Sequence, residues 1–273
     1  MAKLRGALKI KRIGHGGTLD PMATGVLPVF IGRATRAAEF CENAEKEYIA
    51  GLRLGLVTDT QDITGNILHE CGASITAVEL SAVIPRFLGA QKQIPPMYSA
   101  IKREGIKLYE LARQGVEVPR SARDIVIPEI ELLGVNGGGY SLRVACSKGT
   151  YIRTLCHDIG AALGCGGVMS SLRRTRAGAF TIDMAHTLDD ILTAVTSGNI
   201  DKYIIPIDSI FSMYSAVTLN GEETRKCKNG ALCGAIDIPD GKYRFYGPDD
   251  EFIFLGEAVS CEIRIIKRFF YSG

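Results

Sequence analysis

Apolar and polar side chains alternate over residues 47–56, which is the clearest periodic signal along the chain. A period of two is typical of a strand with one buried face. Apolar and β-branched residues also dominate 125–135 and 140–146, and the glycine-rich connection 136–139 separates these two runs. Two such runs joined by a short glycine-rich turn predict a β-hairpin. The middle of the chain is therefore expected to contain a sheet.

Helices are predicted by caps and by composition. Thr76 followed by Glu79 forms a capping box, in which the two residues satisfy free N–H groups of the first helical turn. Gly164 follows an apolar stretch and is a typical helix terminator. The stretches expected to be helical are residues 1–12, 33–43, 76–86 and 150–163.

The order of these elements predicts the fold class. Strands and helices mix without the regular spacing of βαβ units, which favours an α+β layer structure over a doubly wound parallel sheet. Near the C-terminus, three short strand-like runs at 242–246, 252–255 and 263–270 are divided by Gly, Pro and Asp turns, a pattern that suits a small β-barrel. We therefore predict two domains, covering residues 1–213 and 214–273.

The composition is typical of a well-buried globular protein, because 46% of the 273 residues are hydrophobic and 23% are charged. The net charge of +2 is unevenly distributed. Residues 1–36 carry seven basic residues against one acidic, 102–123 carry six against three, and 143–180 carry six against one. If these segments converge, they form a basic face suited to a phosphate backbone; otherwise they are three separate solvated surfaces. The sequence leaves both interpretations open.

Apolar runs are too short to span a bilayer, and the N-terminus lacks the apolar core of a signal peptide. We therefore expect a cytoplasmic protein with no membrane partner. The eight cysteines are scattered through apolar or helical contexts, which favours reduced, buried thiols. No two of them have Cys-x-x-Cys spacing and the four histidines are far apart in sequence, which argues against a metal site.

One carboxylate, Asp20, lies in a glycine- and proline-rich loop over residues 14–28, together with a single histidine. Glycines permit close approach of backbone to a ligand, and Pro21 biases Asp20 toward an extended conformation. The loop is therefore suited to press Asp20 against a ligand. An Asx-type turn, in which the side chain bonds only to nearby backbone, explains the same pattern. From spacing alone, both interpretations stand.

Several longer motifs occur in a fixed order along the chain. They are Gly14-His15-Gly16-Gly17-Thr18-Leu19-Asp20-Pro21 with Ala23-Thr24-Gly25-Val26-Leu27-Pro28, Lys46-Glu47-Tyr48, Leu54-Gly55 with Thr58-Asp59-Thr60-Gln61-Asp62, Ile94-Pro95-Pro96-Met97-Tyr98-Ser99-Ala100, and Cys146-Ser147-Lys148-Gly149-Thr150-Tyr151-Ile152-Arg153. In this order they resemble the TruB family of tRNA pseudouridine synthases. The resemblance is strongest between residues 14 and 180.

The resemblance implies the pseudouridine synthase fold, which has a large mixed β-sheet crossed by the active cleft, and a PUA-like RNA-binding barrel at the C-terminus. It implies an isomerase that converts the uridine at position 55, in the TΨC loop of tRNA, to pseudouridine. Such an enzyme must flip the nucleotide out of its stack and break a glycosidic bond with the help of a carboxylate. No cofactor is required. The expected partner is the TΨC stem-loop, bound by a monomer.

The resemblance also assigns roles to residues. Asp20 is the expected nucleophile, and Arg153 is its charge partner, because a carboxylate in a dry pocket needs a cation to stay ionised. Tyr48 is expected to stack on the base and to take part in proton transfer. His15 is expected to contact the displaced nucleotide. The residues expected to line the nucleotide pocket are Tyr151 and Leu172.

Four of these residues also have a simpler interpretation. Arg153 is also suited to bind a phosphate, and Tyr48 to be a core tyrosine on a strand. Tyr151 and Leu172 are equally suited to packing.

Residues 94–120 match the family's mobile insertion that closes over RNA, where cations and aromatic rings combine. An ordinary amphipathic helix built on Leu108, Leu111 and Ala112 is the alternative. The residues expected to contact RNA, in this segment and elsewhere, are Lys102, Lys107, Arg113, Lys148, Arg173 and Arg174.

The chain departs from the family at its start. Family members begin with a strand and a loop bearing a Lys-Pro-x-Gly motif, and the chain given starts after it. We therefore expect the N-terminal strand and Lys-Pro loop to be missing, and a longer form to be more stable and more active. If the truncation disables the cleft, a non-catalytic tRNA-binding or tRNA-folding protein is the alternative function.

A hydrolase is the remaining alternative. Cys146 and Arg153 are separated by six residues, whereas the phosphatase loop places five between its cysteine and arginine. His15-Gly16-Gly17 is similar to an esterase oxyanion loop, but the chain contains no Gly-x-Ser-x-Gly nucleophile elbow. Neither hydrolase pattern is therefore complete.

Overall fold

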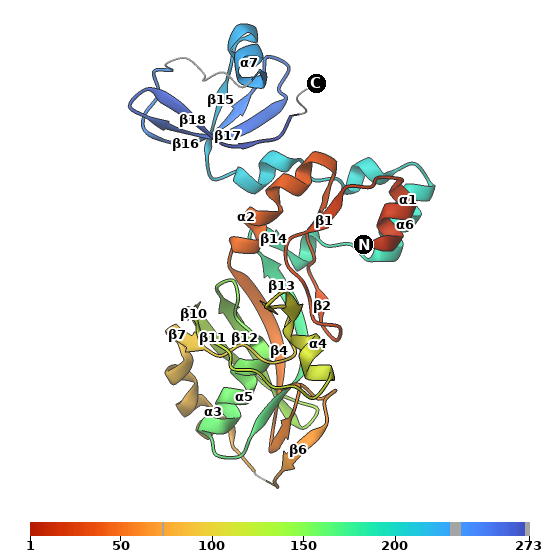
Figure 1. The fold of residues 1–273 in the computed structure, drawn as a ribbon, viewed down its shortest axis with the longest axis vertical. Coiled ribbons are helices and arrows are strands. Elements are labelled where there is room, and N and C mark those ends of the chain that lie inside the picture. Colours follow the sequence, from red (N-terminus) through yellow and green to blue (C-terminus); the bar gives the residue numbers. More distant parts are fainter. Residues whose placement is uncertain (73, 230–235, 271–273) are drawn as a thin grey trace. The chain divides into compact units, whose positions relative to one another are not determined.

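The structure is a computed structural model and describes residues 1–72, 74–229 and 236–270 (Figure 1). Its internal contacts divide the chain into two compact units. The first unit consists of Met1–Thr18, Leu27–Glu42 and His186–Gly273, and the second of Leu19–Val26 and Asn43–Ala185. Among the described residues, every helix is too short or too polar to cross a bilayer.

The second unit is built on a six-stranded mixed sheet in the order β11-β12-β4-β13-β14, with β2 added alongside β13. All neighbours are antiparallel except β2 and β13, which are parallel. The strands are β2 (Thr24–Gly25), β4 (Lys46–Leu54), β11 (Glu129–Asn136), β12 (Gly139–Cys146), β13 (Gly167–Ala177) and β14 (Phe180–Thr181). The strand expected over 47–56 is confirmed as β4, which ends where Gly55 adopts a positive φ of 84°.

The expected hairpin is confirmed for β11 and β12, but the run 125–135 is not one strand. Pro128 divides it, because proline donates no ladder hydrogen bond. Residues before it form β10 (Arg123–Ile127), which pairs with β7 (Gly89–Gln93) in a separate two-stranded sheet. Two further ribbons complete the unit: β5 (Leu56–Thr58) with β6 (Ile67–Glu70), and β8 (Lys102–Arg103) with β9 (Ile106–Lys107).

Short helices complete the second unit: α3 (Ala77–Val83), η2 (Ile84–Phe87), α4 (Leu108–Arg113), α5 (Ile152–Ala162) and η3 (Ile182–Met184). The capping box of Thr76 and Glu79 is confirmed at the start of α3. The helix expected over 150–163 is confirmed as α5, and Gly164 follows it with φ 74°.

Helix α5 packs against β13 and β4 (Figure 1). Ile152, Leu155 and Ile159 are buried in a core shared with strand residues of β4, β12 and β13. A glycine pair makes the approach close, because a Cβ added to Gly160 would lie 2.1 Å from the backbone nitrogen of Gly167. Helix α5 is therefore packed closely against the sheet along its length.

The first unit carries a four-stranded C-terminal sheet in the order β15-β16-β17-β18. A small β-barrel was expected there. Within the described residues the strands form a sheet whose edge strands β15 and β18 do not pair, so no closed barrel is seen in that part of the chain. The elements of this unit are α1 (Ala2–Leu8), β1 (Ile13–His15), β3 (Val29–Ile31), η1 (Gly32–Ala37), α2 (Ala38–Asn43), α6 (Leu188–Thr196), η4 (Ile200–Tyr203), η5 (Ile207–Phe211), β15 (Ser215–Thr218), α7 (Gly221–Lys228), β16 (Gly241–Tyr246), β17 (Phe252–Val259) and β18 (Glu262–Arg268).

Aromatic packing joins the early segment Leu27–Glu42 to the C-terminal sheet within the first unit. Phe211 lies 5.0 Å from Phe40, 5.9 Å from Phe252 and 5.7 Å from Phe269, measured between ring centroids. Such pairs add specific edge-to-face contacts to the area they bury. The contacts thus group two segments that are far apart in the sequence.

The cysteines agree with the sequence in part. The free thiols in the described part of the chain are Cys41, Cys71, Cys146, Cys156, Cys165 and Cys261, of which only Cys261 is exposed. Cys227 is disulfide-bonded, so the expectation of a reduced thiol is wrong there. Cys233 lies outside the described residues. No group of His, Cys, Asp and Glu in the described ranges could hold a metal ion.

Candidate active site

Asp20 and Arg153 form a two-pronged ion pair in the second unit. Nε of Arg153 donates to Oδ2 of Asp20 at 2.8 Å, and Nη2 donates to Oδ1 at 3.2 Å. The Arg153 side chain is 6% exposed, whereas that of Asp20 is 33% exposed. The fork geometry fixes the orientation of the carboxylate as well as its charge. The exposed part of Asp20 is the side that a ligand could reach.

A tight turn presents Asp20 to Arg153. The backbone N–H of Ala23 donates to the carbonyl oxygen of Asp20 at 2.9 Å, and Pro21 sits in the second position, where its fixed φ is favourable. The turn is thus closed by backbone atoms, while the carboxylate bonds to Arg153 across 133 residues of sequence. The ion pair, and not an Asx-type turn, explains the Asp20 side chain.

Strand β2 anchors the other end of this loop. Gly25 lies opposite Arg174 in the parallel pairing of β2 with β13, with φ 98°. The N–H of Val26 donates to the carbonyl oxygen of Arg174 at 2.9 Å, and Nε of Arg174 returns a bond to the carbonyl oxygen of Val26 at 2.7 Å. The loop that carries Asp20 is therefore fastened to the central strand β13.

Two backbone carbonyls complete the hydrogen bonding of the Arg153 guanidinium. Nη1 donates to the carbonyl oxygen of Thr60 at 3.1 Å, and Nη2 donates to that of Tyr98 at 2.9 Å. A guanidinium that is buried and bonded in this way leaves little surface for a phosphate. The geometry therefore favours the role of charge partner over that of a phosphate-binding arginine.

A second carboxylate, Asp62, lies on the far side of Arg153. Its Oδ2 is 3.8 Å from Nη1, and its Oδ1 accepts bonds from the hydroxyl of Thr60 and from the N–H and hydroxyl of Thr64 at 2.6–2.9 Å. Arg153 lies in the first turn of α5, where the helix dipole opposes a cation. Two carboxylates offset that unfavourable interaction.

Tyr48 lies on β4 directly opposite Arg174 of β13. Burial, first of all, raises the pKa of the Tyr48 phenol, and the charges of Cys146 and Asp20 act in the same direction, while Arg174 opposes them through its charge and a hydrogen bond. The raised pKa keeps the hydroxyl protonated at neutral pH. A neutral phenol beside Asp20 can donate a hydrogen bond or a proton.

Arg174 does not offer the RNA contact that the sequence predicted. It is 1% exposed, so no surface of its side chain is open to a phosphate. Its neighbour Arg173 is exposed, and the alternation along β13 directs it to the opposite face of the sheet. Arg174 instead joins the loop that carries Asp20 to Tyr48, because its guanidinium bonds both to the carbonyl oxygen of Val26 and to the Tyr48 side chain.

The face of β4 opposite Tyr48 carries a separate ionic cluster. Glu47 accepts a bond from the hydroxyl of Thr175 at 2.7 Å and pairs with Arg143 at 3.3 Å. The Thr175 bond, with Arg143, lowers the pKa of Glu47 against the opposing effect of burial. Arg143 also contacts Glu129 and Glu131. This cluster stabilises the sheet and lies away from Asp20.

The remaining predicted pocket residues occupy different surroundings. The backbone of Tyr151 is held by the side chain of Gln93, which accepts a bond from the Tyr151 N–H at 2.8 Å and donates one to its carbonyl oxygen at 3.1 Å. Leu172 lies opposite Ala50 on the Tyr48 side of β4 and is 7% exposed. His15 belongs to β1 of the first unit, where its Nδ1 is buried without a hydrogen-bond partner among the described residues.

The predicted RNA-contacting lysines and arginines of the second unit are exposed or half-buried. Lys102, Arg113 and Lys148 are exposed, and Lys107 is half-buried. Lys148 donates to the side-chain oxygen of Asn43 at 2.8 Å. The expected helix within 94–120 is present as α4, with Leu108 buried at 3% exposure. Both an amphipathic helix and a cationic surface therefore occur in this segment.

Cys146 is unsuited to the hydrolase alternative. Burial raises the pKa of its thiol to about 12, so it carries a proton at neutral pH. A phosphatase-type cysteine must be a thiolate, which requires the opposite shift. The side chain is also 1% exposed. Cys146 is therefore a core residue.

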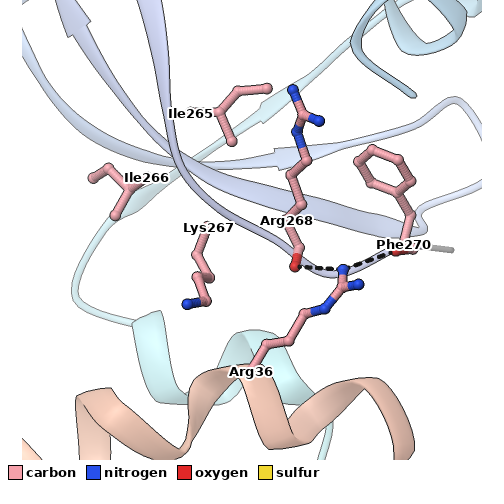
Figure 2. A pocket seen from close by; sticks show the side chains of 6 residues that line it. All are labelled: Arg36, Ile265, Ile266, Lys267, Arg268 and Phe270. Carbon is pink, nitrogen blue, oxygen red and sulfur yellow. Dashed lines mark hydrogen bonds between the residues drawn. The ribbon is translucent and has the colours of Figure 1, made fainter. Parts of the chain in front are cut away.

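The first unit contains a hollow of about 450 Å³ lined by Arg36, Ile265, Ile266, Lys267, Arg268 and Phe270. Figure 2 shows Arg36 reaching the carbonyl oxygens of Arg268 and Phe270, at 3.2 and 3.1 Å. Lys267 pairs with Glu39. Arg36 and Lys267 therefore already have partners, and the lining includes no carboxylate or nucleophile. The hollow thus lacks the features of a catalytic site.

Sequence reasoning did not assign several residues that hold Arg153. Asp62 and Thr60 lay inside a recognised motif but received no role, and the carbonyl of Tyr98 has no side-chain signal at all. Gln93 lay at the end of a segment that showed no periodicity. The Thr- and Asp-rich run over residues 58–62 was the sequence signal that could have drawn attention to Asp62.

Two family models match the chain. Residues 5–152 match the model described as "TruB family pseudouridylate synthase (N terminal domain)", and residues 153–212 match "tRNA pseudouridylate synthase B C-terminal domain". Among relatives named tRNA pseudouridine synthase B, that of Syntrophomonas wolfei is 44% identical over 94% of this chain and 87% of its own length. That of Clostridium tetani is 45% identical over 95% and 90%.

Solved structures also resemble the chain. A chain of the "Crystal Structure of a Cbf5-Nop10-Gar1 Complex" matches with a TM-score of 0.74 and 28% identity, covering 99% of this chain and 80% of that one. A chain of the "Structure of H/ACA RNP bound to a substrate RNA containing 2'-deoxyuridine" matches with a TM-score of 0.73 and 26% identity, over 99% and 80%. The similarity therefore extends over both units.

Proposed function

Because the chain belongs to the TruB family of pseudouridylate synthases, we propose that it isomerises the uridine at position 55, in the TΨC loop of tRNA, to pseudouridine. It is then an isomerase, as its relatives named tRNA pseudouridine synthase B indicate. In the reaction the bond from C1′ to N1 breaks, a bond from C1′ to C5 forms, N1 gains a proton and C5 loses one. Substrate and product have the same composition, so the reaction has no need of a redox cofactor or a group carrier.

The forked ion pair of Asp20 and Arg153 is the observation that carries this proposal. Breaking the glycosidic bond requires a nucleophile or a fixed negative charge close to the sugar or the base. Asp20 supplies it, since its carboxylate is partly open to a ligand while Arg153 fixes its orientation. Attack at C6 of the base, attack at C1′ and glycal formation are all compatible with a carboxylate in this position.

Tyr48 and Leu172 are proposed to hold the flipped base. Both lie on the same side of the sheet, in positions paired with Arg174 and Ala50 on neighbouring strands. The Tyr48 ring is suited to stack on a detached uracil, and its protonated hydroxyl to assist the transfer of the C5 proton. His15 and Tyr151 are proposed to contact the nucleotide as it leaves the stack.

The tRNA is proposed to bind through cations of the second unit and through the C-terminal residues 214–273, which act as a PUA-like module. The proposed phosphate contacts are Lys102, Lys107, Arg113, Lys148 and Arg173. We propose a monomer as the active form. The tRNA substrate favours action in the cytoplasm.

An Asp20→Asn variant tests the proposal. An unmodified tRNA transcript is incubated with each protein, and pseudouridine is mapped by mass spectrometry. We expect modification at position 55 with the parent, none with Asp20→Asn, and tRNA affinity within several-fold of the parent. Asp59→Asn is the matched control, because Asp59 caps only the neighbouring Asn66.

Two outcomes would contradict the proposal. Pseudouridine formed by Asp20→Asn at the parent rate would remove Asp20 from the reaction. A parent protein that binds tRNA tightly but forms no pseudouridine would instead support a non-catalytic tRNA-binding or tRNA-folding function.

A further inference from the structure

Lys107 and Arg113 approach one aromatic ring, that of Tyr109, near the start of α4. Nζ of Lys107 lies 5.3 Å from the ring centroid and donates to the hydroxyl oxygen at 3.3 Å. Cζ of Arg113 also lies 5.3 Å from the centroid. The lysine therefore meets the hydroxyl end of the ring, whereas the guanidinium meets its π system. One tyrosine thus orders two cations through two different interactions.

The charges of these two cations are not neutralised. In the part of the chain that the structure describes, neither Lys107 nor Arg113 forms an ion pair with a carboxylate. Lys107 also lies directly opposite Lys102 in the ribbon of β8 and β9, and like charges in that position repel. A bound anion would relieve this repulsion.

The ring is held by the backbone of its own segment. The N–H of Tyr109 donates to the carbonyl oxygen of Ser99 at 3.1 Å, and that of Leu108 to the carbonyl oxygen of Ile101 at 2.8 Å. The preceding carbonyl, that of Tyr98, accepts from Arg153 at 2.9 Å. Consecutive carbonyls therefore connect the start of α4 to the partner of Asp20.

We propose that Tyr109 is a positioning residue that holds Lys107 and Arg113 ready for two phosphates of the RNA substrate, an inference that rests on the proposed function. Long side chains lose conformational entropy when they are ordered on binding, and cations already held by a ring lose less. A guanidinium stacked on a ring still presents its N–H edge to a phosphate. Tyr109 itself needs no contact with RNA.

A double-mutant cycle tests this inference, with dissociation constants measured on an unmodified tRNA transcript. Tyr109→Leu removes both interactions and is expected to weaken binding about five- to tenfold. Tyr109→Phe removes only the bond to Lys107 and is expected to weaken it about two- to threefold. In a protein that already carries Lys107→Gln and Arg113→Gln, Tyr109→Leu should have no further effect. For Tyr109→Leu and Tyr109→Phe in the otherwise unchanged protein, the effect should appear in the dissociation constant and not in the single-turnover rate at saturating tRNA.

Tyr140→Phe is the control for loss of a tyrosine hydroxyl, because the Tyr140 hydroxyl donates to the carbonyl oxygen of Ile75 at 2.5 Å and accepts no bond from a cation in the described part of the chain. It should leave the affinity unchanged. Melting temperatures show whether each variant is folded, and Tyr109→Phe keeps the test valid if Tyr109→Leu is not.

Two results would overturn the inference. One is an equal loss of affinity from Tyr109→Leu with and without the two cations, which would mean that the ring contacts RNA or only supports the fold. The other is a loss confined to the saturating rate. A parent that forms no pseudouridine, in a cycle that still shows the coupling, would refute the proposed function and leave this inference standing.

Discussion

Gly25→Ala is expected to damage the site from a position that makes no contact with substrate. A Cβ built on Gly25 would lie 2.1 Å from the carbonyl oxygen of Arg174 and 2.8 Å from its nitrogen. Both are backbone atoms of the central strand β13, so neither can rotate away. The φ of 98° is also a conformation that alanine rarely adopts. The substitution therefore combines a clash with backbone strain.

The magnitude follows from these two contributions. A strained backbone costs about 1–3 kcal/mol, and overpacking against a rigid neighbour costs about 1–3 kcal/mol. We expect a loss of about 3 kcal/mol, which lowers the melting temperature by about 6–12 °C for a unit of this size. The clash is relieved only if β2 moves away from β13, and Asp20 moves with it. A displacement of about 1 Å at a reacting group is sufficient to slow a reaction about 100-fold.

Gly164→Ala is the matched control for this prediction. Gly164 also has a positive φ, 74°, and an added Cβ would meet nothing within 4 Å. Only the backbone contribution applies, so we expect a loss of about 1 kcal/mol and a normal reaction rate. Thermal unfolding measures the first quantity, and single-turnover formation of pseudouridine in a tRNA transcript measures the second. If the melting temperature of Gly25→Ala equals that of Gly164→Ala and its single-turnover rate equals that of the parent, the close approach of β2 to β13 does not position Asp20.

Three further predictions concern the charges and thiols. Arg153→Lys loses the paired hydrogen bonds to Asp20 and should lower the single-turnover rate about 100-fold or more, while the tRNA affinity stays within several-fold of the parent. A rate within threefold of the parent would contradict this prediction. Glu47→Gln should lower the free energy of unfolding by at most about 1 kcal/mol above pH 4.5. This difference should vanish as the pH falls through the lowered pKa of Glu47, and the reaction rate should not change. Iodoacetamide at pH 8 should label Cys261 and leave Cys146 unmodified, as peptide mass spectrometry would show, because burial raises the pKa of Cys146 to about 12.

Local signals predicted the elements that position the site. The alternation over 47–56 identified β4, and the apolar stretch before Gly164 identified α5, because periodicity and helix termination are properties of neighbouring residues. The run 125–135 was misread as one strand because the break at Pro128 was overlooked, and the partner strands of its two halves depend on contacts far along the chain. The C-terminal strands were located from their turns, but closure of their sheet could not be predicted, because it depends on whether two edge strands meet.

The surroundings of Arg153 show why a site is harder to predict than its elements. The resemblance placed Asp20 and Arg153 together, and they are bonded in the structure, whereas their catalytic roles stay predictions. The carbonyls of Thr60 and Tyr98 could not be predicted, since any residue type supplies a carbonyl. The burial of Arg174 could not be predicted either, because a basic residue on a strand is read as exposed unless its neighbours are known.

Four separate segments therefore determine the position of one guanidinium. The loop of Asp20, the turn from Thr60 to Asp62, the carbonyl of Tyr98 and the first turn of α5 all meet at Arg153. These bonds all come from groups of the protein itself, so the guanidinium is fixed in one orientation, which is the condition under which a charge acts most effectively on its surroundings. The same arrangement makes the site depend on the close backbone approaches that place the segments. Substitutions at the glycines that allow these approaches, Gly25 and Gly160, should therefore slow the reaction as strongly as substitutions of groups that contact RNA.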